Sequence, residues 1–191
     1  MAAARLNTVL EHDIWPMTVP NDKVADELTP VFLEMGKAVY ICQCLESSLC
    51  LLLATMAHEA ARGEEGAFQA SWDFHSEKTL GNLLKLLREQ IEVPKDVDDY
   101  LRVGLKNRNE IVHGFLTKNA MRLADPKGRL EVEEELAKLK KEVKRRDVLV
   151  NKLLDTLLKK YGLSNEILKR NADRVWDHLN ADAPSDPSST H

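Results

Sequence analysis

Apolar residues recur along most of this chain at alternating steps of four and three, the spacing that places them on one face of an α-helix. The longest run begins after Thr29 and Pro30, a threonine cap followed by proline at the first helical position. It predicts a helix that ends near Gly63, preceded by a short helix from Asn21 to Leu28. Its apolar members are Val31, Met35, Ala38, Cys42, Leu45, Leu49, Leu52 and Met56.

The same spacing, interrupted by turn-forming residues, sets the other expected elements. Residues 63–75 and 116–129 are expected to be connections, the second with room for a short hairpin and a turn at 125–128. The first half of the last long helix, residues 131–147, is densely charged in both signs. Such a stretch is typical of a helix that projects into solvent or pairs with one partner helix. The remaining expected helices cover residues 76–91, 95–115, 130–161 and 165–179.

Composition supports the same fold class. The chain has 191 residues, of which 43% are hydrophobic and 30% charged, with few aromatic residues and few glycines. These proportions describe a globular protein and favour helices over sheets. We therefore expect an all-α bundle of four to five helices with a long charged fourth helix. The expected organisation is a lead-in at 1–21, one helical domain at 22–180 and a disordered Pro/Ser-rich tail at 181–191.

Charge and cysteine content narrow the functional classes. The net charge of −4 opposes nucleic-acid binding by general electrostatic attraction, so RNA would need a local positive patch or a transient contact. The three cysteines, Cys42, Cys44 and Cys50, lie in one apolar run and form no paired framework, which predicts a reducing, cytoplasmic compartment. No signal peptide is read, and polar residues interrupt each apolar run before it reaches the length of a membrane span, so no membrane partner is expected.

Several kinds of catalytic site lack their residues here. On a helix, Cys42 and Cys44 lie about 200° apart and cannot share an ion. The His58-Glu59 pair begins like a zinc-protease helix, but Arg62 stands where the second histidine belongs. Phosphate-binding loops, dinucleotide fingerprints and the serine-hydrolase elbow are all absent from the sequence. We predict neither a metal nor a cofactor.

The stretch from Leu105 to Phe115 breaks the apolar pattern. Arg108 occupies a core-facing position, where burying a guanidinium is costly unless it is paired. In the structural interpretation Arg108 pairs with a carboxylate such as Glu46 and His113 caps the helix end. In the functional interpretation the two residues, with Asn109, form a site. Because Arg108 and His113 diverge by about 140° around the helix, we expect no pair between them on one chain.

A second candidate is a basic cluster in the charged helix. It is interpreted either as a solvated helix face or as a nucleic-acid contact whose field the interleaved glutamates dilute. Its members are Lys138, Lys140, Lys141, Lys144, Arg145 and Arg146.

The run Arg108-Asn109-Glu110-Ile111-Val112-His113 resembles the motif of the HEPN superfamily, an arginine, four residues and a histidine, with a polar residue after the arginine. The context is similar over residues 30–160: a long first helix bearing Glu46, and a Leu-rich second helix that opens with residues 79–81. Phe115 stands where HEPN toxins that pair with nucleotidyltransferase antitoxins have a tyrosine, so regulation through that tyrosine is not expected.

The resemblance implies a four- to five-helix bundle that forms a homodimer, with the motif helices of two chains meeting at the dyad. It implies a metal-independent endoribonuclease of the toxin or phage-defence kind, with an antitoxin or regulatory protein as a further partner. His113 would act as the acid/base group, Arg108 would hold the scissile phosphate and Asn109 would orient either group. The alternatives are a non-catalytic dimerising or regulatory module and a helical scaffold with the charged helix as an arm.

Overall fold

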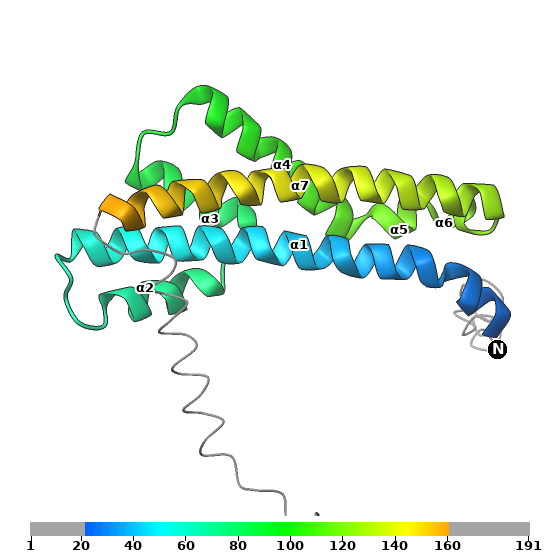
Figure 1. Cartoon of the computed structure of the whole chain (residues 1–191), viewed down its shortest axis with the longest axis horizontal. Coiled ribbons are helices and arrows are strands. Elements are labelled where there is room, and N and C mark those ends of the chain that lie inside the picture. Colours follow the sequence, from blue (N-terminus) through cyan, green and yellow to red (C-terminus); the bar gives the residue numbers. More distant parts are fainter. Residues whose placement is uncertain (1–21, 161–191) are drawn as a thin grey trace, which may run out of the picture.

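The computed structural model describes residues 22–160, and all regular elements in that part of the chain are helices (Figure 1). The prediction of an all-α fold is confirmed, but residues 22–160 contain seven helices, more than the four to five expected, because short helices accompany the two long ones. The lead-in at 1–21, the helix predicted at 165–179 and the tail at 181–191 lie outside the described residues. The helices are α1 (Asp22–Ala60), α2 (Ala67–Ser76), α3 (Leu80–Gln90), α4 (Lys95–His113), α5 (Phe115–Lys118), α6 (Ala120–Leu123) and α7 (Pro126–Lys160).

Two long helices, α1 and α7, lie side by side and run in the same direction (Figure 1). Polar contacts fix their register: Glu34 pairs with Lys140, and the Ser48 hydroxyl donates to Asp147 Oδ1 over 2.7 Å. The charged first half of α7 therefore pairs with a helix of its own chain, one of the two outcomes that its charge pattern predicts. The segment between α1 and α7 returns the chain to the end at which α1 begins, which is what a parallel pair requires.

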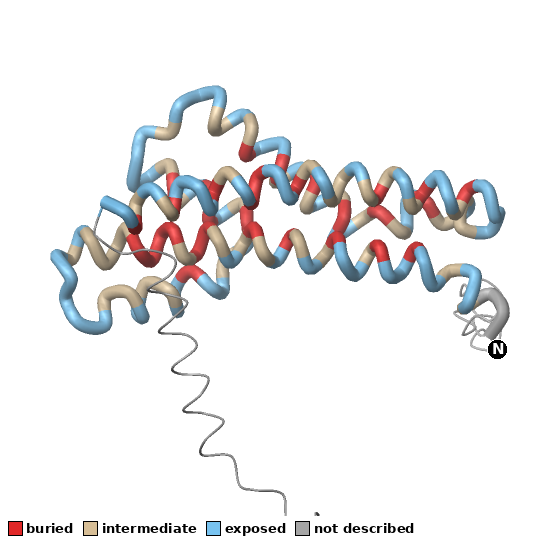
Figure 2. Tube along the Cα trace, viewed as in Figure 1, coloured by how far each residue is buried: buried red, intermediate tan, exposed pale blue. Residues whose placement is uncertain are grey.

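The core lies along the seam between α1 and α7 and is closed by α3 and α4 (Figure 2). The four leucines of α3 that face inward are almost fully buried, as the predicted Leu-rich face requires. Burying a leucine contributes roughly 1.5–3 kcal/mol, so this face holds α3 against the long helices. These leucines are Leu80, Leu83, Leu84 and Leu87.

The predicted helix start at Thr29 and Pro30 is wrong, because α1 runs through both residues from Asp22. Proline removes one backbone donor and so leaves a carbonyl of the preceding turn without its helical partner. The carbonyl concerned is that of Asp26, which is exposed to solvent, while the Thr29 hydroxyl donates to the neighbouring Ala25 carbonyl over 2.9 Å. Glu27, in the turn before the proline, also pairs with Arg129 at 2.6 Å, which holds this end of α1 against α7.

The predicted connection at 63–75 is also wrong, since most of it forms α2. Gly66 adopts a φ of +84°, a left-handed conformation that suits glycine, and the helix begins at the next residue. Phe68 and Trp72 stack one turn apart with ring centroids 6.5 Å apart. The helix expected from residue 76 starts later than predicted: the Ser76 hydroxyl donates back to Asp73 O, and α3 begins only after the extended Thr79.

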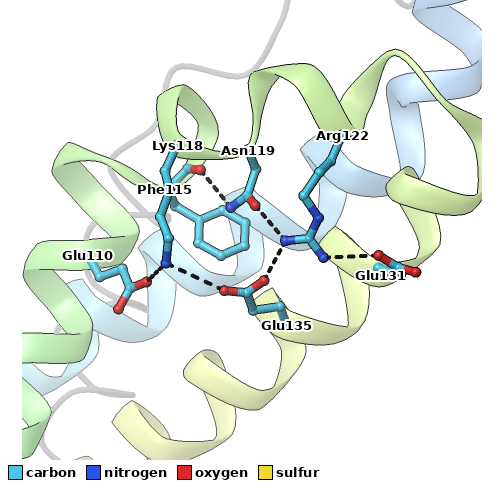
Figure 3. Close-up of polar contacts among 7 residues, drawn as sticks. All are labelled: Glu110, Phe115, Lys118, Asn119, Arg122, Glu131 and Glu135. Carbon is cyan, nitrogen blue, oxygen red and sulfur yellow. Dashed lines mark hydrogen bonds and ion pairs between the residues drawn. The ribbon is translucent and has the colours of Figure 1, made fainter.

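The segment 116–129 was expected to be a loop with a hairpin, but it forms α5, α6 and the start of α7. A polar network explains the order of this segment (Figure 3). Buried Asn119 donates to the Phe115 carbonyl over 2.9 Å and accepts from Arg122 Nη1 over 2.6 Å. The same Arg122 nitrogen lies 2.7 Å from Glu135 of α7, so one side chain joins the short helices to the long one.

Candidate functional site

The out-of-pattern arginine of α4 is held by a carboxylate of α1. Arg108 Nε donates to Glu46 Oε1 over 2.8 Å, and the two side chains are 14% and 21% exposed. Glu46 is the partner that the structural interpretation proposes. The pair offsets the desolvation of both charges and fixes α4 against α1 at this point.

Arg108 and His113 meet on one chain, so the prediction that they diverge too far is wrong. Arg108 Nη1 lies 3.0 Å from His113 Nε2 and 3.2 Å from Asn109 Oδ1. The angle around the helix describes only the Cα–Cβ directions, and a long arginine side chain spans the difference. The structure thus brings together the four residues singled out in the sequence. We call Glu46, Arg108, Asn109 and His113 the α4 cluster.

The chemistry of the Arg108–His113 contact fixes which group donates. A guanidinium has only donors, so in the Arg108–His113 contact Nε2 of His113 is the acceptor. A ring nitrogen that accepts beside a fixed cation is also placed to take a proton from an attacking hydroxyl.

The α4 cluster is open to solvent on one side. His113 and Asn109 are exposed, whereas Arg108 is half-buried and hydrogen-bonded to Glu46. Among residues 22–160, Arg108 Nη2 has no hydrogen-bond partner, so the guanidinium keeps one donor for an incoming anion. An anion that replaced His113 as the acceptor of Nη1 would receive two parallel hydrogen bonds, the geometry in which arginine binds phosphate.

The Cys42 thiol, which interacts with Arg108 and Glu46 of the α4 cluster, has low reactivity. Burial raises the pKa of the Cys42 thiol; with the opposing effect of the Arg108 charge and the smaller contribution of Glu46 included, this pKa moves from its ordinary 9.0 to about 11. Burial also raises the pKa of Cys50, whose thiol donates to the His75 carbonyl over 3.4 Å. Cys44 is only half-buried. Cys42 and Cys50 therefore act as core side chains.

We expect iodoacetamide at pH 8 to label Cys44 quickly and Cys42 at least tenfold more slowly, because the thiolate is the nucleophile and two pKa units reduce it about a hundredfold. Mass spectrometry of the native protein over time measures the order. The Cys44→Ser protein should lose the fast phase, and denaturant should make all three thiols react alike. Fast labelling of Cys42 in the folded protein would contradict the assignment.

A groove with a volume of about 1040 Å³ lies on the outer face of α7, between α1 and α4. The cations that line it include four of the six in the predicted basic cluster. Their charge is partly compensated: Glu34 pairs with both Lys37 and Lys140, and the Lys140 hydrogen bond holds the pKa of the Glu34 carboxyl below its ordinary value. Asp147 and Glu142 pair with two more of these cations. The cationic lining residues are Lys37, Lys140, Lys141, Lys144, Arg145 and Lys152.

Arg146 of the basic cluster does not face the groove. It is 4% exposed, its guanidinium stacks on the Tyr100 ring at 4.0 Å, and it donates to the Tyr100 carbonyl over 3.2 Å. A side chain at Gly104 would meet Arg146 Cγ at 2.9 Å, so glycine makes the room. The sequence carried this signal, because Arg146 stands in the apolar seam of α7 as Arg108 does in α4. We missed it because we interpreted Arg146 as part of a basic surface.

Side chains of the types that bind metal ions are not grouped together in the described part of the chain. Among residues 22–160, no three histidine, cysteine, aspartate or glutamate side chains are grouped closely enough to hold a metal ion. His58, the candidate from the zinc-protease comparison, lies half-buried with its Nδ1 unpartnered in the described part of the chain.

One helix is more apolar than the sequence pattern suggested. The part of α1 from Ala25 to Ala60 is long and apolar enough, by length and composition, to cross a membrane, contrary to our expectation that no run reaches this threshold. The core helix of a soluble protein passes the same test, and α1 buries Leu45, Leu49 and Leu53 against the other helices. The finding therefore identifies the central helix of the bundle and assigns no location.

Comparison with known proteins adds no relative. No family model, curated protein or solved structure matches this chain. The function proposed for this chain therefore rests on the geometry of the α4 cluster.

Proposed function

We propose that this protein is a metal-independent endoribonuclease whose active centre is the α4 cluster. The observation that carries the proposal is the contact between Arg108 Nη1 and His113 Nε2 at a solvent-open surface. It places a basic nitrogen beside a fixed cation with a free donor, the two groups that phosphodiester cleavage by a neighbouring hydroxyl requires. The resemblance to the HEPN motif over the same residues supports the proposal.

The proposed reaction starts when an RNA phosphate takes the Arg108 donors. His113 Nε2 then accepts the proton of the adjacent ribose 2′-OH, whose oxygen attacks the phosphorus. The bond from phosphorus to the 5′ oxygen breaks, leaving a 2′,3′-cyclic phosphate and a 5′-hydroxyl. Arg108 stabilises the charge that develops on the phosphate oxygens, Glu46 fixes the guanidinium, and Asn109 orients it through Oδ1.

A homodimer would complete this chemistry. The departing 5′ oxygen needs a proton while His113 is taking one from the 2′-OH, and the α4 cluster has only one imidazole. A second copy of the chain would bring a second His113, which in its protonated form would give the departing 5′ oxygen its proton. We place this RNase in the cytoplasm as a toxin or phage-defence enzyme, held in check by an antitoxin or regulatory protein.

The rival function is a non-catalytic dimerising module. It is favoured by the Glu46–Arg108 pair, which by itself accounts for a core-facing arginine. In that case the motif residues would secure packing and an interface, and RNA would stay intact. The scaffold alternative is less favoured, because α7 packs along α1 and does not extend as a free arm.

Incubation of the full chain with 5′-labelled total cellular RNA in excess EDTA tests the proposal. We expect cleavage products that end in a cyclic phosphate and begin with a 5′-hydroxyl, recognised by their response to phosphatase and kinase. The Arg102→Ala protein, altered at an exposed arginine of the same helix, should cleave equally well. Activity that falls faster than linearly on dilution would support the dimer. Intact RNA at micromolar protein would favour the rival function.

A further inference from the structure

A small pocket beside the α4 cluster has no role in the scheme above. Its volume is about 330 Å³, at the small end of the roughly 300–1,000 Å³ found for ligand sites. Glu46 lines it and also binds Arg108, so the pocket adjoins the site where the scissile phosphate is proposed to bind. The other lining residues are Gln43, Ser47, Cys50, Trp72, Ser76 and Lys78.

We propose that this pocket binds the base of a nucleotide next to the scissile phosphate and so gives the enzyme a base preference. The inference rests on the proposed function, since it assigns the substrate contact of the same site. The α1 residues of the pocket lie at 43, 46, 47 and 50, a spacing that puts them on one face of the helix. A strand of RNA held at Arg108 would pass along that face.

The aromatic wall of the pocket is fixed in place. Trp72 is half-buried and stacks on Phe68 with the two rings inclined by 10°. A rigid indole is a good surface for a base, because stacking of a base on an aromatic side chain is worth about 1–3 kcal/mol and requires little ordering. Trp72 also packs against the buried core of the bundle, which holds the indole in place.

The polar groups of the pocket are free to read a base edge. Within residues 22–160, neither the Gln43 amide nor the Ser47 hydroxyl has a hydrogen-bond partner. A glutamine amide offers both donors and an acceptor, so it matches the paired donor and acceptor of a base edge. The Ser76 hydroxyl donates to Asp73 O and still has lone pairs to accept.

The charge at the pocket suits a neutral base with an anionic phosphate. Lys78 lies 4.4 Å above the Phe74 ring and forms no ion pair with a carboxylate of the described residues. Its ammonium group is therefore available to a phosphate at the pocket's edge. The only carboxylate in the lining is Glu46, and Arg108 already compensates its charge. A free acidic ligand is a poorer match, because its carboxylate would approach Glu46 once inside.

Two surface substitutions test the pocket without disturbing the core. We expect Gln43→Ala to raise KM roughly tenfold for the preferred oligoribonucleotide and to flatten the preference at one position, with kcat within about twofold. Lys78→Ala should raise KM for all sequences and lower the salt slope of binding by about one unit. The matched controls are Gln90→Ala and Lys85→Ala, both exposed on α3. Unchanged KM and unchanged preference in both pocket variants would overturn the inference.

A binding measurement separates this inference from the proposed function. Oligonucleotides with a 2′-deoxy substitution at the cleaved position bind without reacting, and fluorescence anisotropy gives their affinity for each variant. If the wild type does not cleave RNA but the pocket variants bind these oligonucleotides more weakly than the controls, the pocket stands and the RNase proposal falls. If all variants bind equally, or none binds, the pocket assignment falls whether or not RNA is cleaved.

Discussion

The His113→Ala protein should cleave RNA about 10²–10⁴-fold more slowly than wild type, the usual loss when a general base is removed. The side chain is exposed and its ring contacts Arg108, so its removal leaves no buried group unpaired and should change the free energy of unfolding little. Single-turnover rates on one labelled substrate measure the effect. Equal rates for the two proteins would exclude His113 as the base.

Added imidazole provides a sharper readout. Because His113 lies at the surface, free imidazole should enter the gap left in His113→Ala and restore part of the rate as its concentration rises. A purely structural histidine would give no such rescue. The rescued rate should follow the neutral fraction of the added imidazole, and Lys106→Ala, an exposed change on the same helix, should show neither loss nor rescue.

Arg108 serves both packing and chemistry, and two variants separate these roles. Arg108→Ala removes the charge and leaves Glu46 unpaired, so we expect it to lose both activity and stability. Arg108→Lys keeps a cation for Glu46 but lacks the forked donors that reach His113 and a phosphate together. It should therefore stay folded and lose cleavage. A lysine variant with wild-type cleavage would mean that the fork is not used.

The sequence predicted the long helices and singled out Arg108, Asn109 and His113, because these depend on patterns within one helix. The regularly spaced apolar residues of α1 and α7 face the core in the structure. Arg108 is conspicuous in the sequence because it interrupts such a spacing in α4. The pairing of Arg108 with Glu46 across 62 positions could only be offered as one candidate. Which carboxylate an arginine meets depends on how two helices cross, and no local pattern encodes that.

The failures also have physical causes. Arg108 and His113 diverge by about 140° only in their backbone directions, and the long arginine side chain reaches across that divergence to the histidine ring. The short helices α5 and α6 were missed because a buried amide, Asn119, organises them, and a lone asparagine signals a turn as readily as a helix. Pro30 was wrongly interpreted as a helix start. The contacts that stabilise this turn of α1 come from the side chains of Thr29 and Glu27, which the apolar pattern does not describe.

The turn signal at residues 125–128 marks the start of α7. Asp125 Oδ2 accepts from the Gly128 backbone N–H over 2.9 Å, the bond of an N-cap, and Pro126 occupies the first helical position. The role of Gly128 is steric: a Cβ there would lie 2.2 Å from the Arg122 carbonyl oxygen.

Gly128→Ala should therefore destabilise the protein by about 1–3 kcal/mol or more, since a backbone atom must move to admit the methyl group. Arg122 has little freedom to yield, because its side chain is tied to Asn119 and Glu135 (Figure 3). Urea unfolding followed by circular dichroism gives the change in the free energy of unfolding. The amides of α5 and α6 should lose most of their protection from hydrogen exchange, because these helices must shift away from α7.

Gly36→Ala is the matched control. Gly36 lies in the interior of α1, and a Cβ there would meet nothing within 4 Å. Alanine at an open helical position usually stabilises a protein by about 0.5–1 kcal/mol, because glycine loses more backbone entropy on folding. The same substitution should thus have opposite signs at the two sites. If Gly128→Ala were also stabilising, the close packing of α6 against the start of α7 would be wrong, and with it the path by which the chain returns to lay α7 along α1.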